Sequence, residues 1–205
     1  MLTVRHLTYK LDNRVILKNV NISINSGEIV GVTGSNGTGK TTLLNLLMGV
    51  IKCQKGDIYW EEQVKKAILY QESTFPDWVT AKDAINLFLG LQRHHEDTKE
   101  MINLIDSINL NKEISQLSGG EKRFLDFVLT LSGNPNFLIL DEPTTAMDIS
   151  TEAQFWGIID NLIKLGTTMI IVMHDINMLR KRCHTIYELN NGDLDKVYIH
   201  DVTSS

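Results

Sequence analysis

Short apolar runs alternate with helix-period segments along most of this chain. Runs rich in valine, isoleucine, leucine, threonine and tyrosine, bounded by turn residues, are typical of strands. They predict strands at Leu2–Tyr9, Val15–Ile24, Ile29–Val32, Ile58–Trp60, Ala67–Tyr70, Phe137–Leu140, Thr167–Met173, Thr185–Leu189 and Leu194–Ile199. Turns are expected between them, for example at Leu11–Asn13 and at Asn190–Asp193.

Between these strands, apolar residues recur at intervals of three and four, which is the spacing of one helix face. Three helices are predicted at Leu43–Met48, at Thr151–Lys164 and, as a short helix, from Asp175 to Arg180. Three more are predicted from their apolar faces. The first begins at Thr80 or Asp83 and carries Ala84, Leu87, Phe88 and Leu91; the second carries Met101, Leu104, Ile105 and Ile108; the third begins at Ser118 and carries Phe124, Phe127, Val128 and Leu131. Strands that alternate with helices predict an α/β fold with a parallel sheet. Ligands bind at the carboxyl ends of such strands, and Lys40, Asp141 and His174 all follow predicted strands.

Composition narrows the class of protein. The chain has 205 residues, of which 42% are hydrophobic and 22% charged, and this suits one compact domain. The net charge of −5 provides no basic field for nucleic acid, so we expect no nucleic-acid partner. Cys53 and Cys183 lie far apart and predict free thiols in a reducing compartment. Because no segment reaches the roughly 20 apolar residues of a spanning helix, we expect any membrane role to depend on a partner.

A glycine-rich segment follows the predicted strand Ile29–Val32. It fits the phosphate-binding P-loop, in which glycine and four further residues precede Gly-Lys-Ser/Thr. Its residues are Gly34, Ser35, Asn36, Gly37, Thr38, Gly39, Lys40, Thr41 and Thr42. We expect Lys40 to reach the β- and γ-phosphates of a nucleoside triphosphate and Thr41 to ligate Mg²⁺. The alternative, a flexible glycine loop, is disfavoured because a strand and a helix flank the segment as a P-loop requires.

Two acidic residues, Asp141 and Glu142, follow the apolar run Phe137–Leu140. Adjacent residues of a strand point in opposite directions, so the two carboxylates are expected to have different roles. Asp141 is the candidate to hold Mg²⁺ opposite Thr41. Glu142 is the candidate to polarise the water that attacks the γ-phosphate. Alone, the pair is equally well explained as an acidic turn, but beside a P-loop the catalytic interpretation is favoured.

The segment Ser118, Gly119, Gly120 and Glu121 matches a capping box, in which serine and the acid three residues later bind the first free N–H groups of a helix. A capping box explains Ser118 and Glu121. It does not explain two glycines in the first turn, which cost about 1 kcal/mol each relative to alanine. We therefore expect a ligand, most simply a phosphate, to approach these N–H groups closely.

Taken together, these motifs resemble the nucleotide-binding domain of ABC transporters over nearly the whole chain. Gly34–Thr42 resembles the Walker A motif and Phe137–Glu142 the Walker B motif. The other matches are Gln71 at the Q-loop, Leu117–Glu121 at the signature motif, Ala146–Asp148 at the D-loop and His174 at the switch histidine. The resemblance implies one ABC ATPase domain, 1–205. Its P-loop NTPase core, 1–71 and 118–205, would include an N-terminal antiparallel β subdomain, and 72–117 would form a short helical subdomain.

The resemblance also implies roles for individual residues. Two copies or paralogues would pack head to tail, with each ATP between one Walker A motif and Ser118–Gly120 of the other copy. Gln71 would sense Mg²⁺ and water and relay the change to an integral-membrane subunit. His174 would contact the γ-phosphate and hold Glu142 and the water, while Asp148 would communicate across the dimer.

Two positions depart from the family pattern. Leu11 falls where an aromatic residue normally stacks on adenine, and leucine offers no π-face. Tyr9, on the same strand face, is a possible substitute. We therefore predict weaker and less base-selective nucleotide binding than in the family. Glu121 stands where glutamine is commoner, and the capping box predicts that its carboxylate turns back to the Ser118 N–H.

The resulting functional prediction is an ATPase subunit that drives separate membrane-spanning transporter subunits from the cytoplasmic face of the membrane. The segment Asp141–Asp148 resembles bacterial exporter ATPases, which tilts the prediction toward export. Two alternatives remain open: a soluble ABC ATPase that acts as an assembly scaffold, and a degenerate nucleotide-binding partner. The intact Lys40, Glu142 and His174 disfavour the degenerate partner.

Overall fold

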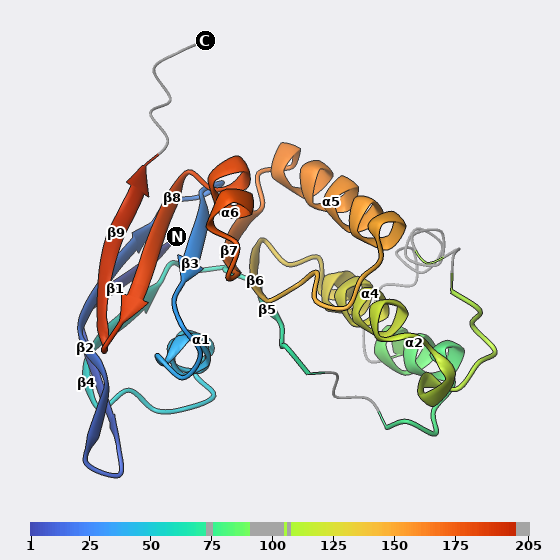
Figure 1. The fold of residues 1–205 in the computed structure, drawn as a ribbon, viewed down its shortest axis with the longest axis horizontal. Coiled ribbons are helices and arrows are strands. Elements are labelled where there is room, and N and C mark those ends of the chain that lie inside the picture. Colours follow the sequence, from blue (N-terminus) through green and yellow to red (C-terminus); the bar gives the residue numbers. More distant parts are fainter. Residues whose placement is uncertain (73–75, 91–104, 106–107, 200–205) are drawn as a thin grey trace.

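The computed structural model describes residues 1–72, 76–90, 105 and 108–199, which form two sheets and their covering helices (Figure 1). The strands are β1 (Leu2–Leu11), β2 (Arg14–Ile24), β3 (Ile29–Thr33), β4 (Lys55–Trp60), β5 (Lys66–Leu69), β6 (Phe137–Asp141), β7 (Thr168–Val172), β8 (Thr185–Asn190) and β9 (Asp193–Ile199). The α-helices are α1 (Lys40–Met48), α2 (Ala81–Gly90), α4 (Gly119–Thr130), α5 (Ile149–Lys164) and α6 (Ile176–Arg182), with 3₁₀ turns at Ile114–Gln116 and Leu131–Gly133.

The central sheet is six-stranded, in the order β5-β6-β7-β3-β8-β9. Its neighbouring strands are parallel except for β8 and β9, which form a hairpin. The register pairs Val172 with both Val32 and Asp141, so the carboxyl ends of β3, β7 and β6 lie side by side. The predicted parallel sheet is therefore confirmed, and it aligns the strand ends at which we expected the site.

A second, antiparallel sheet has the order β2-β1-β4. Leu2 of β1 pairs with Ile24 of β2 on one side and with Trp60 of β4 on the other. The predicted N-terminal antiparallel sheet is confirmed. The turn at Asp12 and Asn13 is made by two residues with positive φ, 46° and 66°, a conformation that asparagine and aspartate tolerate better than most residues.

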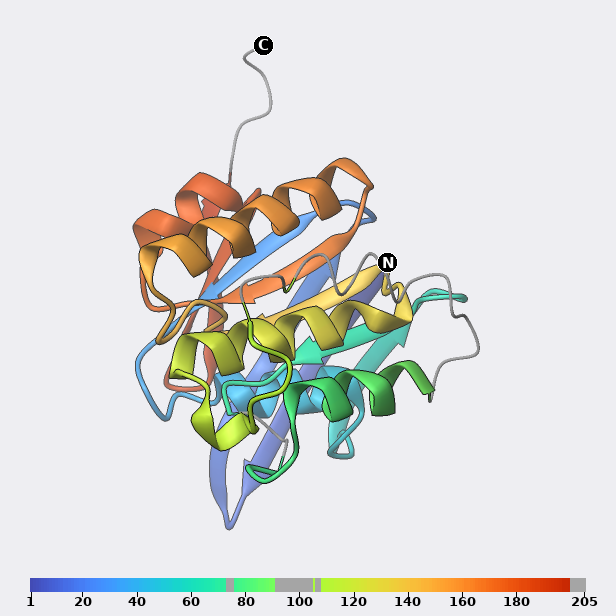
Figure 2. The same ribbon diagram turned by 90° about the vertical axis from the view of Figure 1, so that its right-hand side faces the viewer.

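The central sheet is buried on both faces because its strands alternate between two hydrophobic clusters. In β6, Phe137 and Ile139 join the cluster of α1 and the antiparallel sheet, while Leu138 and Leu140 join that of α4 and α5. Figure 1 shows the antiparallel strands on one side of the central strands and α2, α4 and α5 on the other. In the view of Figure 2, these three helices lie across the front of the molecule.

Helix α2 buries a different stripe from the predicted one. Ala81, Ala84 and Ile85 are buried and Phe88 is half-buried, whereas Leu87 is 59% exposed. Positions 81, 84, 85 and 88 follow the i, i+3, i+4, i+7 rule, and position 87 lies off that stripe. The prediction that Leu87 shares the apolar face is therefore wrong, while Leu91 lies outside the described residues.

Main-chain hydrogen bonds join the two ends of the segment that the sequence assigns to a helical subdomain. The N–H groups of Ala81 and Lys82 bond to the carbonyls of Lys112 and Leu110, at 3.0 and 2.9 Å. Ile114 N–H bonds to the Val79 carbonyl at 2.8 Å. The predicted helix around Met101–Ile108 lies outside the described residues, apart from Ile105 and Ile108, which are buried.

None of the helices in the described part of the chain combines the length and the apolar character needed to cross a membrane.

Candidate active site

The P-loop runs from the end of β3 to the first residue of α1, as predicted. Gly34 has φ 150°, and a Cβ there would lie 2.4 Å from the Leu189 carbonyl oxygen, so only glycine fits. Lys40, which begins α1, is only 9% exposed. Its Nζ donates to the carbonyls of Gly34 and Ser35 at 2.8 and 3.0 Å, so the ammonium group lies over the loop where a phosphate would bind.

Thr41 and Asp141 face each other across the carboxyl ends of the strands. The Thr41 hydroxyl donates to Oδ2 of Asp141 at 3.4 Å. Asp141 is 3% exposed; burial raises its pKa, while the charges of Arg123 and Lys40 oppose that rise. A hydroxyl and a carboxylate in this arrangement are the oxygen ligands that Mg²⁺ prefers, so the chemistry of the pair fits a magnesium site.

Glu142 lies directly beyond β6 in a left-handed conformation, with φ 48°. Its Oε1 lies 3.3 Å from Nε2 of His174, within ion-pair distance. Hydrogen-bond geometry is not met, and this buried oxygen has no hydrogen-bond partner in the described part of the chain. Burial raises the pKa of Glu142, and His174 opposes the rise. A buried carboxylate oxygen with unused acceptor capacity is suited to orient a water or accept its proton.

These groups share one cavity of about 450 Å³. It brings together the P-loop, the segment after β5, the end of β6 and the segment after β7, which are far apart in sequence. The lining residues are Ile16, Asn36, Gly37, Gly39, Lys40, Thr41, Thr42, Gln71, Asp141, Glu142 and His174. The predicted Gln71, Glu142 and His174 therefore lie on the same cavity as the P-loop lysine.

Leu11 does not line this cavity. It is 55% exposed at the end of β1, whereas Ile16 of the neighbouring strand is part of the lining. Tyr9 packs half-buried against the hydrophobic cluster of the antiparallel sheet and is also absent from the lining. Sequence reasoning missed Ile16, because an isoleucine in a β-strand is most simply interpreted as core.

The signature residues and Asp148 also lie away from this cavity, and both act as helix caps within the chain. The capping box is present: Glu121 N–H donates to Ser118 Oγ at 3.1 Å, and Ser118 N–H donates to Glu121 Oε2 at 2.7 Å. Asp148 caps α5 by accepting from Thr151 N–H at 2.7 Å. That hydrogen bond lowers the pKa of Asp148.

Gly120 has a structural role that the sequence analysis did not foresee. A Cβ there would lie 2.7 Å from the Ala146 carbonyl oxygen and 2.9 Å from the Met147 Cα. The close approach that requires Gly120 is thus made by the chain's own main chain at Ala146 and Met147, which corrects the assignment of this glycine to a phosphate. Gly119 is exposed, and a Cβ there would lie 3.2 Å from the Ala146 Cβ.

Arg123 is a second residue that sequence reasoning missed. It lies in α4 and is 5% exposed. Its guanidinium donates to the main-chain carbonyls of Tyr70, Asp141, Glu142 and Pro143. Burial lowers the pKa of Arg123, and the nearby carboxylates of Asp126, Asp141 and Glu142 oppose that change.

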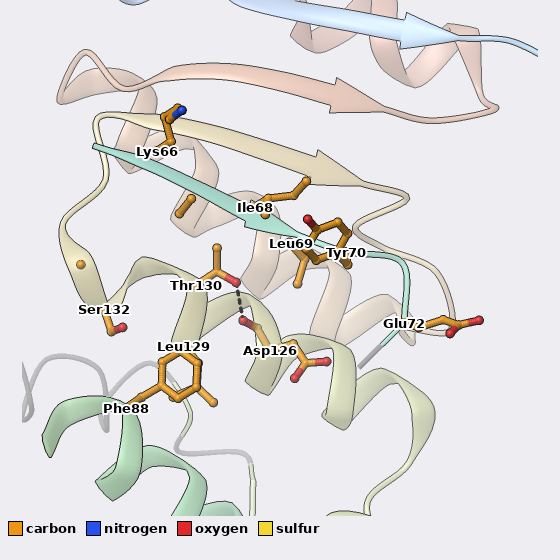
Figure 3. A pocket seen from close by; sticks show the side chains of 12 residues that line it. Lys66, Ile68, Leu69, Tyr70, Glu72, Phe88, Asp126, Leu129, Thr130 and Ser132 are labelled. Carbon is orange, nitrogen blue, oxygen red and sulfur yellow. Dashed lines mark hydrogen bonds between the residues drawn. The ribbon is translucent and has the colours of Figure 1, made fainter. Parts of the chain in front are cut away.

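A second cavity, of about 390 Å³, is lined by residues on either side of Gln71 in the sequence (Figure 3). Its walls come from β5, α4 and α2, and Tyr70 and Glu72 line it while Gln71 lines the first cavity. Figure 3 shows Phe88 of α2 and Asp126 and Thr130 of α4 on the opposite wall from β5. Three consecutive residues thus connect the two cavities.

The sequence was compared with models of known protein families. The ABC transporter model matches residues 17–145, more than half of the chain. This chain belongs to the ABC transporter family.

Curated relatives of this ABC protein include a probable metal transport system ATP-binding protein of Thermotoga maritima. It is 38% identical over 195 residues, which cover 91% of this chain and 80% of the relative. The nickel import system ATP-binding protein NikE of Staphylococcus aureus is 29% identical, covering 94% and 88%. An aliphatic sulfonates import ATP-binding protein of Shouchella clausii is 30% identical, covering 89% and 74%. The tilt toward export thus finds no support, because two of these relatives are named as import proteins.

Among solved structures, the chain is similar to a dimeric ATP-binding cassette in a post-hydrolysis state bound to ADP and Pi. The identity is 25% and the TM-score 0.81, with 97% of this chain and 99% of that chain covered. A dimeric bacterial ABC transporter cassette is 26% identical at the same TM-score and coverage. The predicted α/β P-loop NTPase fold is confirmed. ATP hydrolysis is general to ABC cassettes, and this chain is an ABC ATPase.

The contact of Gly120 with the D-loop segment yields a stability prediction. We expect Gly120→Ala to lower the free energy of unfolding by about 1–3 kcal/mol, because the added methyl group would overpack against main-chain atoms. Gly157→Ala is the matched control: a Cβ there would meet nothing within 4 Å, on an exposed face of α5. It should stabilise by about 0.5–1 kcal/mol. Urea unfolding of both variants measures the difference, and equal stability of Gly120→Ala and wild type would contradict the prediction.

Proposed function

We propose that this ABC ATPase powers an importer that takes up a metal ion or metal complex through separate membrane-spanning subunits. The proposal is carried by one observation: Lys40, Gln71, Glu142 and His174 share a single cavity in a chain whose relatives include a probable metal transport system ATP-binding protein and a nickel import system ATP-binding protein. In this proposal the protein associates with the cytoplasmic face of the membrane only through its partner subunits.

The charged residues of the cavity, together with Thr41 and Gln71, then have separate tasks in hydrolysis. Lys40 and the P-loop N–H groups bind the β- and γ-phosphates, which displaces the ammonium group from the two loop carbonyls. Thr41 and Asp141 would hold Mg²⁺, with Gln71 nearby, and the bound ion would supply positive charge to the phosphate oxygens. Glu142 orients the attacking water, and His174, whose Nε2 lies 3.3 Å from Glu142 Oε1, fixes the Glu142 side chain.

The positions of Ser118–Gly120 and Asp148 support a head-to-tail dimer. Both lie outside the cavity of their own chain, while Ser118 and Gly119 are exposed at the N-terminus of α4. A helix N-terminus favours phosphate, so in the proposed dimer the end of α4 with the exposed Gly119 faces the ATP bound by a second copy. Similarity to two dimeric cassettes is in keeping with this arrangement.

The second cavity, lined by Tyr70 and Glu72, is the proposed binding site of the membrane subunit. Residues 76–90 and 108–117 belong to the proposed helical subdomain, 72–117, whose two ends pair through main-chain hydrogen bonds. This subdomain and the core both contribute walls to the cavity, through Phe88 and Tyr70 respectively. A partner seated there would touch Glu72, next to Gln71, and a displacement of this segment would reach the nucleotide.

Hydrolysis and dimerisation are tested together with Glu142→Gln. We expect the variant to bind ATP, to hydrolyse it about 100-fold or more slowly, and to form a stable dimer on size exclusion with Mg²⁺ and ATP, because amide replaces the base at constant size. Glu62→Gln, at an exposed position, is the control and should match wild type. Undiminished turnover by Glu142→Gln would contradict the assigned role. A monomer at saturating ATP would mean that the second ATPase is a different chain or that the membrane subunit must align the copies.

Direction of transport is tested in cells in which Glu142→Gln replaces the native protein. An importer predicts lower cellular content of its metal, measured by elemental analysis, whereas an exporter predicts higher content. Unchanged content of every metal would instead favour the scaffold alternative or a non-metal cargo. Glu72 lines the proposed docking cavity, so Glu72→Lys should also lower the cellular metal content, whereas Glu62→Lys should leave it unchanged.

Nucleotide selectivity is tested at position 11. Leu11 lies outside the cavity lining, and only the family resemblance places the adenine against it. On that basis we expect wild type to discriminate little between ATP and GTP, and Leu11→Tyr to tighten ATP binding about 2- to 10-fold, because aromatic stacking adds about 0.5–1.5 kcal/mol. Val197→Tyr, at another half-exposed strand position, is the control. Equilibrium titration with both nucleotides measures the effect. A strong ATP preference in wild type would contradict the prediction.

A further inference from the structure

Arg123 makes an unusual set of contacts for an arginine within a helix. Nearly all of its side chain is buried, and the four hydrogen bonds described above go to main-chain carbonyls of two separate segments. Three of these carbonyls belong to consecutive residues, Asp141, Glu142 and Pro143. The fourth belongs to Tyr70, which precedes Gln71 in the sequence.

The geometry of this contact follows from the backbone at Glu142. Because Glu142 adopts a left-handed conformation, with φ 48°, the chain turns sharply there, and the carbonyls on either side of the turn converge on one guanidinium. The Nε–H donates to Pro143 at 3.3 Å, and Nη2 donates to Asp141 and, at 3.2 Å, to Glu142. A planar fork with five N–H donors suits such a cluster, whereas the single ammonium group of lysine does not span it.

The contact with Tyr70 extends the same fixation to the Gln71 segment. The Tyr70 carbonyl and the Gln71 N–H belong to one planar peptide group. The hydrogen bond from Arg123 to this carbonyl therefore also fixes the orientation of the main chain at the start of Gln71. The side chain of Gln71 then lines the nucleotide cavity together with Glu142. One guanidinium therefore fixes the main chain beneath two residues that face the same ligand space.

We propose that Arg123 is a positioning residue for ATP hydrolysis, which fixes the main chain at Glu142 and at Gln71 relative to each other. Arg123 does not line the nucleotide cavity and acts through these two residues. Arg123 also lies one helical turn after Gly120. The same helix, α4, therefore begins at the signature motif and binds the main-chain turn at Glu142. The inference rests on the roles proposed above for Glu142 and Gln71.

The test compares Arg123→Gln and Arg123→Lys with wild type in ATP binding and steady-state hydrolysis by the purified full chain. We expect Arg123→Gln to lower kcat about 10- to 100-fold, since misplacement of a catalytic group by about 1 Å has effects of that size. The KM and the Kd for ATP should change less than about threefold, because the P-loop is untouched. Arg123→Lys keeps the charge and part of the bonding, and its kcat should lie between the two.

Lys181→Gln is the matched control, because it removes one positive charge at an exposed site and should keep wild-type kcat. If Arg123→Gln does not fold, the lysine variant decides: a lowered kcat at unchanged Kd supports the proposal, and a wild-type kcat overturns it. A fall in ATP affinity that matches the fall in kcat would also overturn it, because a merely structural role would damage binding and turnover together.

Glu142→Gln distinguishes the proposed role of Arg123 from the proposed mechanism. If that variant is inactive while both Arg123 variants keep wild-type kcat, only the role of Arg123 is wrong; if Glu142→Gln remains active, the proposed mechanism is wrong.

Discussion

Parallel pairing of β3 with β7 and of β7 with β6 is the constraint on which the candidate site depends. Because Val172 pairs with Val32 on one side and Asp141 on the other, three strands end at the same level. The residues that follow each strand then share a cavity, although Lys40 and His174 are far apart in sequence. The strands themselves are held by burial on both faces, so the position of the site follows from the hydrophobic pattern of the sheet.

Electrostatics at this edge of the sheet explain why anionic and cationic groups occur there together. Burial raises the pKa values of Asp141 and Glu142, because a carboxylate loses hydration at a buried site. The charges of Lys40, Arg123 and His174 act against that rise. Phosphate oxygens would add further negative charge, so the proposed binding of Mg²⁺ by Thr41 and Asp141 and of the γ-phosphate by Lys40 would each favour the other.

Local rules were sufficient for much of the fold and part of the site. The strands, the P-loop and the capping box at Ser118 were all predictable, because each depends on residues close together in the sequence. Arg123 and Gly120 were not predictable, because their partners, at Tyr70 and Ala146, are brought near only by the tertiary fold. Within α4, an arginine among buried apolar residues gives no local signal that distinguishes it from a solvent-facing one.

The contacts of Gly120 and Arg123 have a joint mechanical consequence. Arg123 binds the carbonyls of Asp141–Pro143, and the Gly120 backbone lies against Ala146 and Met147, so α4 holds the segment after β6 at both ends. Asp148, next in the chain, caps α5 and extends the same fixation to the following helix. A shift of the main chain at Glu142 would therefore disturb the contacts that α4 makes with this segment. In the proposed dimer the N-terminus of α4 faces the ATP of the second copy, so the same contacts would make hydrolysis at one site sensitive to occupancy of the other.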